Sequence, residues 1–276
     1  MCLIAFAIGA SDKWPLVVAS NRDEFLDRPT LPLARWTTSA GKEVISGRDE
    51  RAGGTWLGLS PGGRVAMLTN VREPQPSNAE KSRGELVMQW LEGESDLASF
   101  MTKTDGAAYG PCNLVLGRLG SATWHWLTNR GESAGWSSQV LAPGTYGLSN
   151  GALDAPWPKT LALRQALQTV LAVDSQEELE DGLWAALMNG RRAEIDDLPD
   201  TGVPLALEHA LSSAFVEFPE HGYGTRCSTL VVVERLENAT GSVTHPVSVK
   251  ERSHTRSAAG IQFLQTNVGL GWPYPT

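Results

Sequence analysis

The sequence predicts an α+β fold, because strand-like and helix-like segments follow one another in the order strands, helices, strands, helices, strands. Neighbouring strands joined by tight turns outnumber strand–helix–strand units, which favours mainly antiparallel sheets with helices packed on them. The composition is 41% hydrophobic and 20% charged over 276 residues, which is ordinary for a globular protein with a sizeable core. Because no repeat or linker divides the chain, we expect a single domain over residues 1–276.

Short apolar or β-branched runs bounded by turn residues predict the strands. In chain order these are Leu3–Ile8, Trp14–Ser20, Leu57–Leu59, Arg64–Thr69, Asn113–Leu119, Ala122–Leu127, Val140–Tyr146, Thr225–Leu236, Ser242–Arg252 and Ile261–Gln265. The first two are joined by a tight turn and predict a hairpin. The prolines between Arg28 and Pro32 interrupt the pattern and predict a loop.

Apolar residues three or four positions apart predict the helices. In chain order these are Ser82–Leu91, Asp96–Lys103, and two stronger segments over 163–171 and 179–187. Ser82 is expected to cap the first helix, with Glu85 completing a capping box. The segment Leu205–Phe218 is compatible with either a helix or irregular structure.

Charge and cysteine usage exclude several classes of protein. The net charge is −8 and the pI about 5.2, which argues against a nucleic-acid partner. Without a signal peptide or an apolar run of about 18 residues, we expect a cytoplasmic protein with no membrane span. The three cysteines, Cys2, Cys112 and Cys227, suit a reducing compartment and show no zinc-site spacing, so no metal site is expected.

Cys2 is the first candidate for chemistry because of its position in the chain. Removal of Met1 would make Cys2 both the chain terminus and a thiol, so that one residue would carry a nucleophile and its own amine base. A free α-amine has a pKa of about 7.7–8.0 and a thiol one of about 8.5, so the amine can accept the thiol proton near neutral pH. The alternative is a buried structural thiol, which is the commoner state of a free cysteine.

Four polar residues near the ends of predicted strands are candidates to complete such a site: Asp23, Asn70, Asn150 and Arg226. Acyl transfer needs a nucleophile, a group that orients its amine, and donors for an oxyanion. Asp23 is suited to hold the α-ammonium, and Arg226 to stabilise the thiolate. Asn70 and Asn150 are suited to donate hydrogen bonds to the oxyanion. Taken singly, each residue is more simply explained as a turn or capping residue.

The combination of motifs in this chain resembles a known family. The motifs are Cys2, Asn21-Arg22-Asp23-Glu24, Gly47-Arg48-Asp49, Gly53-Gly54-Thr55-Trp56-Leu57-Gly58, Leu68-Thr69-Asn70 and Gly224-Thr225-Arg226. Together they resemble the NRDE family, also called the transport and Golgi organization 2 family. That family resembles the N-terminal nucleophile (Ntn) hydrolases. The resemblance therefore implies a four-layer αββα sandwich, with two mainly antiparallel sheets between helix layers.

More distantly, the pattern is similar to penicillin V acylases and bile salt hydrolases. The resemblance implies that the N-terminal Cys of those enzymes corresponds to Cys2, their Asp to Asp23, their two Asn to Asn70 and Asn150, and their late Arg to Arg226. Further motif residues are expected to bind the ligand, namely Asn21, Arg22, Arg48 and Trp56. One position differs, because those amidases have an Arg three residues before the Asp, where this chain has Ser20. We expect the nearby Arg22 to point to the opposite sheet face from Asp23.

Two classes of function follow from the resemblance. The first is hydrolysis of amide C–N bonds in a small apolar substrate, through a thioester on Cys2 and without a cofactor. The second is a non-catalytic protein that uses the same pocket for haem binding or haem trafficking, or that has an acyl-CoA or lipid-related binding role. Haem needs an axial ligand such as His, Cys, Met or Tyr, and Cys2 or a histidine would serve. A retained Met1 would remove the amine base and favour the second class.

Overall fold

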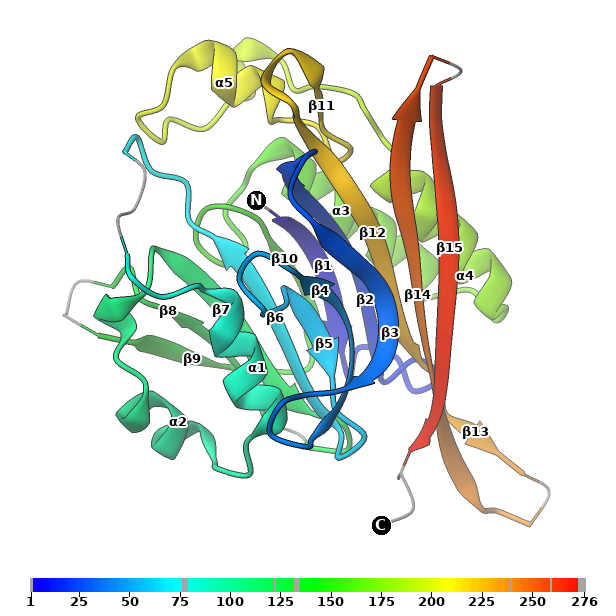
Figure 1. Cartoon of the computed structure of the whole chain (residues 1–276). Coiled ribbons are helices and arrows are strands. Elements are labelled where there is room, and N and C mark those ends of the chain that lie inside the picture. Colours follow the sequence, from blue (N-terminus) through cyan, green and yellow to red (C-terminus); the bar gives the residue numbers. More distant parts are fainter. Residues whose placement is uncertain are drawn as a thin grey trace.

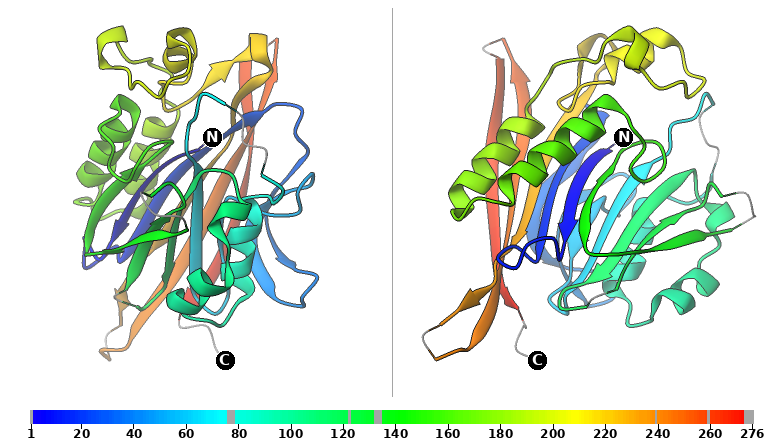
Figure 2. Two further views of the ribbon diagram at one scale, coloured as in Figure 1. Left: turned by 90° about the vertical axis from the view of Figure 1, so that its left-hand side faces the viewer. Right: turned by 180° about the vertical axis from the view of Figure 1, so that it is seen from behind.

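Two antiparallel sheets pack face to face, and helices cover the outer side of each, which makes a four-layer αββα sandwich (Figure 1, Figure 2). The computed structural model describes residues 2–75, 79–121, 123–131, 135–238, 240–258 and 260–272. The expected removal of Met1 and the start of the expected strand at Ala122 lie outside these residues. The predicted fold class, α+β with mainly antiparallel sheets, is confirmed.

The first sheet contains the start of the chain. Its strands follow the spatial order β10-β1-β2-β12-β14-β13, with β11 beside β12 and β15 beside β14. Their bounds are β1 (Cys2–Ile8), β2 (Leu16–Phe25), β10 (Gly144–Leu148), β11 (Glu217–Phe218), β12 (Tyr223–Val233), β13 (Leu236–Glu237), β14 (Val243–Ser257) and β15 (Gly260–Trp272). Strand β1 pairs with β10 on one side and β2 on the other. The N-terminal strand is therefore inside the sheet and not at its edge.

The second sheet is a meander, because its spatial order β3-β4-β5-β6-β7-β8-β9 is also its chain order. Its strands are β3 (Thr30–Thr37), β4 (Glu43–Asp49), β5 (Leu57–Leu59), β6 (Arg64–Asn70), β7 (Cys112–Arg118), β8 (Trp124–Thr128) and β9 (Ser137–Leu141). Every pairing described in it is antiparallel. Short local turns therefore connect this sheet, whereas the first sheet gathers strands from both ends of the chain.

Helices lie on the outer face of each sheet. Their bounds are α1 (Gly84–Glu92), α2 (Leu97–Lys103), α3 (Pro158–Val170), α4 (Gln176–Leu187) and α5 (Leu205–Ala210), with single 3₁₀ turns at Gly106–Ala108, Ile195–Asp197 and Pro219–His221. Apolar residues of α3 and α4 pack on the first sheet, and those of α1 and α2 pack on the second. Helix α5 lies beyond the end of the sandwich at which β1 begins (Figure 1).

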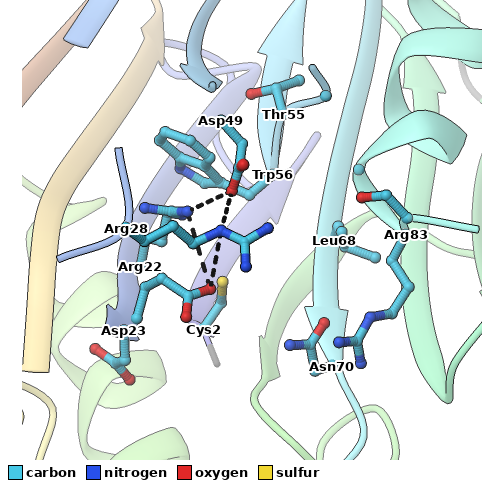
Figure 3. A pocket seen from close by; sticks show the side chains of 14 residues that line it. Cys2, Arg22, Asp23, Arg28, Asp49, Thr55, Trp56, Leu68, Asn70 and Arg83 are labelled. Carbon is cyan, nitrogen blue, oxygen red and sulfur yellow. Dashed lines mark hydrogen bonds and ion pairs between the residues drawn. The ribbon is translucent and has the colours of Figure 1, made fainter. Parts of the chain in front are cut away.

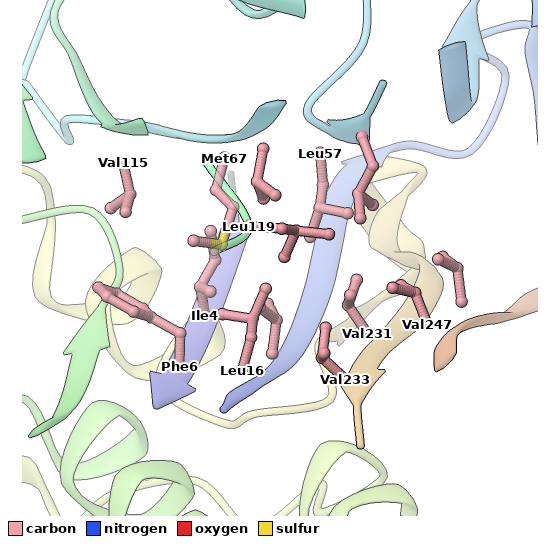
Figure 4. Packing of buried hydrophobic residues seen from close by; sticks show 14 of the residues in the cluster. Ile4, Phe6, Leu16, Leu57, Met67, Val115, Leu119, Val231, Val233 and Val247 are labelled. Carbon is pink, nitrogen blue, oxygen red and sulfur yellow. The ribbon is translucent and has the colours of Figure 1, made fainter. Parts of the chain in front are cut away.

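The apolar residues of β1 belong to two different hydrophobic cores. Ile4 and Phe6 belong to the cluster between the sheets, whereas Leu3 and Ala5 belong to the cluster under α3 and α4. Figure 4 shows Ile4 and Phe6 on the side of the first sheet that faces Met67 of β6. A strand that is buried on both faces needs apolar residues at every position. This explains the uninterrupted apolar run at the start of the chain.

Two expectations near the N-terminus are corrected by the structure. Strand β2 continues to Phe25, so the run Asn21–Glu24 is part of the strand and does not follow it. The expected loop after Arg28 is largely the edge strand β3, whose register with β4 shifts between Leu31 and Ala34. Pro32 falls within that shift, where a missing N–H costs no ladder hydrogen bond.

Three further segments differ from the sequence prediction. The run Val140–Tyr146 is divided between β9 and β10, which belong to different sheets. Pro143 separates them, consistent with the exclusion of proline from strand interiors. The last two long strands extend further than expected because β14 and β15 pair continuously from His245 opposite Trp272 to Ser257 opposite Gly260. The ambiguous segment before β12 resolves into α5, a loop and β11.

The start of α1 differs from the expected capping box. The helix begins at Gly84, and no side chain caps it. Glu85 Oε1 instead accepts a hydrogen bond from Gln89 Nε2 at 2.8 Å. A Cβ on Gly54 would lie 2.5 Å from the carbonyl carbon of Gly84, so the two backbones touch directly. This contact, and not a cap at Ser82, places the start of α1 against the second sheet.

We predict that Gly54→Ala lowers the free energy of unfolding by about 1–3 kcal/mol, because its Cβ would force two backbones apart. The matched control is Gly62→Ala, whose Cβ would meet only Ser60 Oγ at 3.7 Å. It should change the free energy of unfolding by no more than about 0.5 kcal/mol. Urea denaturation of both variants makes the comparison, and equal effects would contradict the close-contact argument.

Candidate functional site

Cys2 lies at the N-terminal end of β1, directly opposite Arg22 of β2. Paired residues on antiparallel strands point to the same face, so both side chains enter the space between the sheets. There they line a pocket of about 100 Å³ (Figure 3). The residues that line it are Cys2, Arg22, Asp23, Glu24, Arg28, Asp49, Gly54, Thr55, Trp56, Leu68, Asn70, Ser82, Arg83 and Gly84. Both sheets and the start of α1 therefore contribute to its walls.

Two arginines and two carboxylates form a charged cluster beside Cys2. Arg22 Nη2 donates to Asp49 Oδ2 at 2.9 Å, and Arg28 Nε donates to the same oxygen at 2.6 Å. Both guanidinium groups also approach Glu24 Oε2, at 3.9 and 4.0 Å. Arg22 belongs to the first sheet and Asp49 to the second. The cluster therefore joins the two sheets at the Cys2 end of the sandwich.

Asp49 also holds the turn that follows β4. Its Oδ1 accepts hydrogen bonds from the backbone N–H groups of Arg51 and Ala52 at 3.1 and 3.0 Å. Burial opposes ionisation of Asp49, but the hydrogen bonds from Arg28 and from Ala52 outweigh it and lower the pKa of this carboxyl. Asp49 is therefore an anion at neutral pH, with both of its oxygens engaged.

Trp56 brings two of the sequence motifs together in space. The Arg22 guanidinium lies over the Trp56 ring at 4.3 Å from its centroid, in the geometry of a cation–π contact. Gly47 lies in β4, and a Cβ at this position would come within 2.5 Å of the Trp56 ring. Gly47 therefore leaves the space that the indole fills, and the indole supports the arginine that faces Cys2.

The Cys2 thiol is buried, and this burial raises its pKa above the ordinary value. Arg22 acts in the opposite direction, whereas Asp23 and Glu24 add to the rise. The thiol is therefore protonated at neutral pH, and a base must remove its proton before it can act as a nucleophile. The backbone carbonyl of Cys2 accepts a hydrogen bond from Ser149 Oγ at 3.2 Å, which ties the start of β1 to the end of β10.

The two asparagines suggested as oxyanion donors are in direct contact. Asn150 Nδ2 donates to the backbone carbonyl of Asn70 at 2.8 Å, and Asn150 Oδ1 accepts from Ser149 Oγ at 3.3 Å. The Asn70 side chain lines the pocket across from Cys2 (Figure 3). Asn150 is buried and is not among the described lining residues. In this arrangement Asn150 positions the end of β6, and Asn70 is the asparagine that faces the pocket.

Asp23 is among the lining residues, but its carboxyl group points to the opposite side of the first sheet from the Arg22 side chain, as expected from strand geometry. Its Oδ1 accepts a hydrogen bond from Thr225 Oγ1 at 2.7 Å. Burial raises the pKa of Asp23, and the nearby Lys159 of α3 opposes that rise. Burial also lowers the pKa of Lys159 to about 8, while its Nζ donates to the Leu211 carbonyl at 2.8 Å. Lys159 is therefore a buried cation near Asp23 on the helix-covered side of the first sheet.

Arg226 is placed differently from the sequence expectation. Its Nη1 donates to the backbone carbonyls of Phe25, Leu26 and Arg28 at 2.9, 2.7 and 3.0 Å. It is not among the described residues that line the Cys2 pocket. Arg226 therefore holds the loop that carries Arg28, and the cation that faces the thiol is Arg22.

Asn21 and Arg48 are also outside the described lining of the pocket. Asn21 points to the helix face of the first sheet, where its Nδ2 donates to the carbonyls of Leu187 and Ala214 at 2.8 Å each. Arg48 is exposed, and its guanidinium lies 4.8 Å from the ring centroid of Trp36. Of the four expected ligand-binding residues, the structure brings Arg22 and Trp56 to the pocket.

Sequence reasoning missed four charged residues at this end of the fold: Arg28, Asp49, Arg83 and Lys159. Asp49 could have been predicted from the sequence, because it follows Arg48 in the motif Gly47-Arg48-Asp49 and successive strand residues face opposite sides. Lys159 carried a weaker signal, since a lysine in the first turn of a helix is unfavourable with the helix dipole. We find no sequence signal for Arg83, whose role depends on where α1 begins.

The lining of the pocket limits which ligands it can hold. Cys2 is the one lining side chain, among the described residues, of a type that commonly ligates haem iron. Most of the lining is polar or charged, which suits a ligand with polar groups better than the small apolar substrate that the resemblance implied. Within the described residues, no group of three or more His, Cys, Asp or Glu side chains could hold a metal ion. No helix in the described part of the chain is long and apolar enough to cross a membrane.

Comparison with known proteins identifies the family. The family model described as Transport and Golgi organisation 2 matches residues 1–242. The chain belongs to this family. The Bos taurus Transport and Golgi organization protein 2 homolog is 34% identical over 263 residues, which cover 88% of this chain and 91% of that protein. The Homo sapiens homolog of the same name is 35% identical over 266 residues, with the same coverage.

A solved structure of similar fold comes from a different protein. The Caenorhabditis elegans N-acylethanolamine-hydrolyzing acid amidase ortholog superposes with a TM-score of 0.51 at 11% sequence identity. The match covers 84% of this chain and 92% of that chain. At this identity the likeness concerns the fold alone, and it supports the predicted αββα sandwich of Ntn-hydrolase type for this member of the Transport and Golgi organisation 2 family.

We predict that Asp49→Asn lowers the free energy of unfolding by about 1.5–3 kcal/mol at neutral pH, because charge-assisted hydrogen bonds from two arginines are lost. The folded-state pKa of Asp49 is lowered, so its contribution is present above the ordinary pKa of about 3.9 and is lost as the pH falls through the folded value. Urea denaturation of wild type and variant should therefore converge at acid pH. Glu50→Gln, at the exposed neighbouring position, is the control, and a pH-independent gap for Asp49→Asn would contradict the ion-pair argument.

Lys159 gives a prediction at alkaline pH. Its folded pKa is about 8, whereas an unfolded lysine titrates near 10.4. Between about pH 8 and pH 10.4 Lys159 is largely neutral in the folded state but still protonated in the unfolded state. Stability therefore rises with pH in this range, because the folded state no longer buries a charge. Relative to Lys159→Met, the wild type should gain up to about 3 kcal/mol of unfolding free energy as the pH rises to about 10.4. Parallel denaturation curves at every pH would show that Lys159 is not a buried cation.

Proposed function

We propose that the chain is an amide hydrolase with Cys2 as its nucleophile. The observation that carries the proposal is the position of Cys2, at the start of an inner strand, with its side chain in a pocket beside Arg22. The described lining includes neither Cys112 nor Cys227. The solved neighbour of similar fold is, by its name, a hydrolase of N-acylethanolamines, which are amides. That name supports amide chemistry for a protein of this fold.

The proposed reaction begins after removal of Met1, which frees the α-amine of Cys2. The amine takes the proton from Sγ, and Sγ attacks the carbonyl carbon of the amide to form a tetrahedral intermediate. The C–N bond then breaks as the α-ammonium gives its proton to the leaving amine, which leaves an acyl thioester on Cys2. Water next attacks the thioester while the α-amine accepts its proton. The acid is released, and the thiol is restored.

Groups around the pocket have distinct parts in this proposal. The Asn70 side chain donates to the oxyanion, and Asn150 positions Asn70 through the hydrogen bond to its carbonyl. Asp23 holds the α-ammonium, supported by Thr225 Oγ1 at 2.7 Å. Arg22 stabilises the thiolate in place of Arg226. Because Arg22 already pairs with a carboxylate, its charge is oriented before a substrate arrives, as electrostatic catalysis requires.

Haem binding or trafficking remains the alternative proposal, together with an acyl-CoA or lipid-related role. The pocket volume of about 100 Å³ is below the roughly 300–1,000 Å³ of typical ligand and cofactor sites. It suits a short acyl group better than a porphyrin. Apart from Gly54 and Gly84, its only described apolar lining residues are Trp56 and Leu68. The Arg22 guanidinium lies over the Trp56 ring, so little apolar surface is left on which a macrocycle would stack. These features favour the hydrolase proposal for this pocket.

The proposal predicts that short acyl 4-nitroanilides are hydrolysed by the wild type with release of 4-nitroaniline. Cys2→Ala should lower turnover by at least about 10³-fold, as expected for removal of a nucleophile. The matched control is Cys112→Ala, which should retain turnover because Cys112 lies in the core under α1. Intact mass should show a chain without Met1 and, during turnover, an acyl adduct on Cys2. A retained Met1 with no adduct would contradict the hydrolase proposal.

The haem alternative is tested with the same proteins. Titration with haem, followed at the Soret band, should produce a shift if Cys2 is the axial ligand, and Cys2→Ala should abolish it. The hydrolase proposal expects no specific shift with either protein. A stoichiometric shift that depends on Cys2, without anilide turnover, would favour the binding protein.

A further inference from the structure

A second pocket adjoins the Cys2 pocket on the side across from Arg22. Asn70 and Arg83 line both pockets, so they form the boundary between them. The second pocket measures about 330 Å³, against about 100 Å³ for the first. Figure 3 shows Asn70 and Arg83 next to each other at this boundary. A ligand with one group at Cys2 therefore has room for its remainder beyond Arg83.

Arg83 differs from the other arginines of the Cys2 pocket in its partners. Arg22 and Arg28 share the carboxylates of Asp49 and Glu24. Arg83 Nη1 donates to the Pro111 carbonyl at 3.3 Å, and no carboxylate of the described residues lies within ion-pair distance of it. Arg83 is thus a half-buried cation whose charge is not neutralised by the protein groups around it.

Arg72 supplies an independent second observation in the same pocket. Its side chain is almost fully buried, and Nη1 donates to Glu208. Nε and Nη2 are buried and have no hydrogen-bond partner among the described residues. Glu208 is also engaged by the backbone N–H of Thr201 at 3.2 Å. Buried donors without partners are rare in native proteins and call for an explanation. Arg72 thus places a second guanidinium, with unused donors, in the wall of this pocket.

The other residues that line the second pocket indicate which further groups its ligand has. Apolar side chains make up half of the wall: Val71, Pro111, Val203, Leu207 and Leu211. The acidic residue of the lining, Glu73, forms an ion pair with Arg130, so it does not cancel the charge of Arg83. The second pocket therefore offers two guanidinium groups next to an apolar surface.

We propose that the second pocket binds an anionic group, a carboxylate or a phosphate, of the ligand whose carbonyl is held at Cys2. Arg83 donates to the anion, and a small shift of the buried Arg72 side chain brings its unused donors to the same group. The apolar wall packs against the carbon atoms next to the anion. The assignment of the carbonyl end to Cys2 rests on the proposed hydrolase function. The anion subsite itself rests on Arg72 and Arg83. A substrate of this kind is a short N-acyl compound with an acidic, partly apolar leaving group.

The test uses three matched probes and the Cys2→Ala protein, which binds without turnover. The probes are N-acetyl-L-leucine, its phosphonic acid analogue and the uncharged N-acetyl-L-leucinamide. Isothermal titration at constant ionic strength should show that at least one acid binds about tenfold or more tightly than the amide, as charge-assisted hydrogen bonds require. The better of the two acids tells whether a carboxylate or a phosphate is the natural group.

Arg83→Gln, in the same Cys2→Ala background, should remove most of this preference while it leaves the affinity for the amide within about twofold. Arg83→Lys should retain part of it, because the charge is kept without the guanidinium geometry. The matched control is Arg191→Gln, at an exposed side chain away from both pockets, and it should leave all three affinities unchanged. Equal binding of acids and amide, a preference that survives Arg83→Gln, or no binding of any probe would overturn the anion subsite.

Turnover separates this inference from the proposed function. If the Cys2→Ala protein prefers an acid probe but the wild type hydrolyses none of the short acyl amides, the hydrolase proposal fails and the anion subsite stands. If the wild type hydrolyses amides without preference for acids, the reverse holds.

Discussion

The contact of Arg22 and Arg28 with Asp49 is the interaction on which this end of the molecule depends. The core between the sheets is apolar, and apolar contacts have no direction, so they do not by themselves set how the strand ends meet. The Arg22–Asp49 hydrogen bond at 2.9 Å joins a strand of one sheet to a strand of the other. It places Arg22 beside Cys2 and leaves the small pocket between them and α1. The charges of these two arginines are held in place and balanced by the carboxylates of Asp49 and Glu24.

Hydrogen bonds from side chains to backbone carbonyls hold the strand ends around the pocket in place. Ser149 binds the carbonyl of Cys2, and Asn150 binds the carbonyl of Asn70. These two neighbours connect the start of β1, the end of β10 and the end of β6. Side chains that bind main-chain groups act as positioning residues, so part of the sequence signature serves geometry and not contact with a ligand. Arg226, with three backbone acceptors, is of the same kind.

Much of the fold was predictable, because it depends on local patterns. Runs of apolar residues and leucines at helical spacing predicted most strands and the two helices on the first sheet. The edge strand β3 was missed because prolines usually break strands, and here Pro32 sits in a register shift. The division of Val140–Tyr146 between two sheets was also beyond a local pattern. This division depends on the strand with which each half of the segment pairs, and that strand is not predicted by the local sequence.

The sequence by itself determined the fold class, the family and the choice of Cys2 as the candidate nucleophile, because a thiol at position 2 and a set of motifs are properties of the chain alone. Only the tertiary structure decided which charged side chains surround that thiol. A strand residue changes face with each step, so Asp49 enters the pocket and Arg48 does not. The cations at the second pocket, Arg72 and Arg83, come together through contacts between segments distant in sequence. Such contacts leave no mark in local composition.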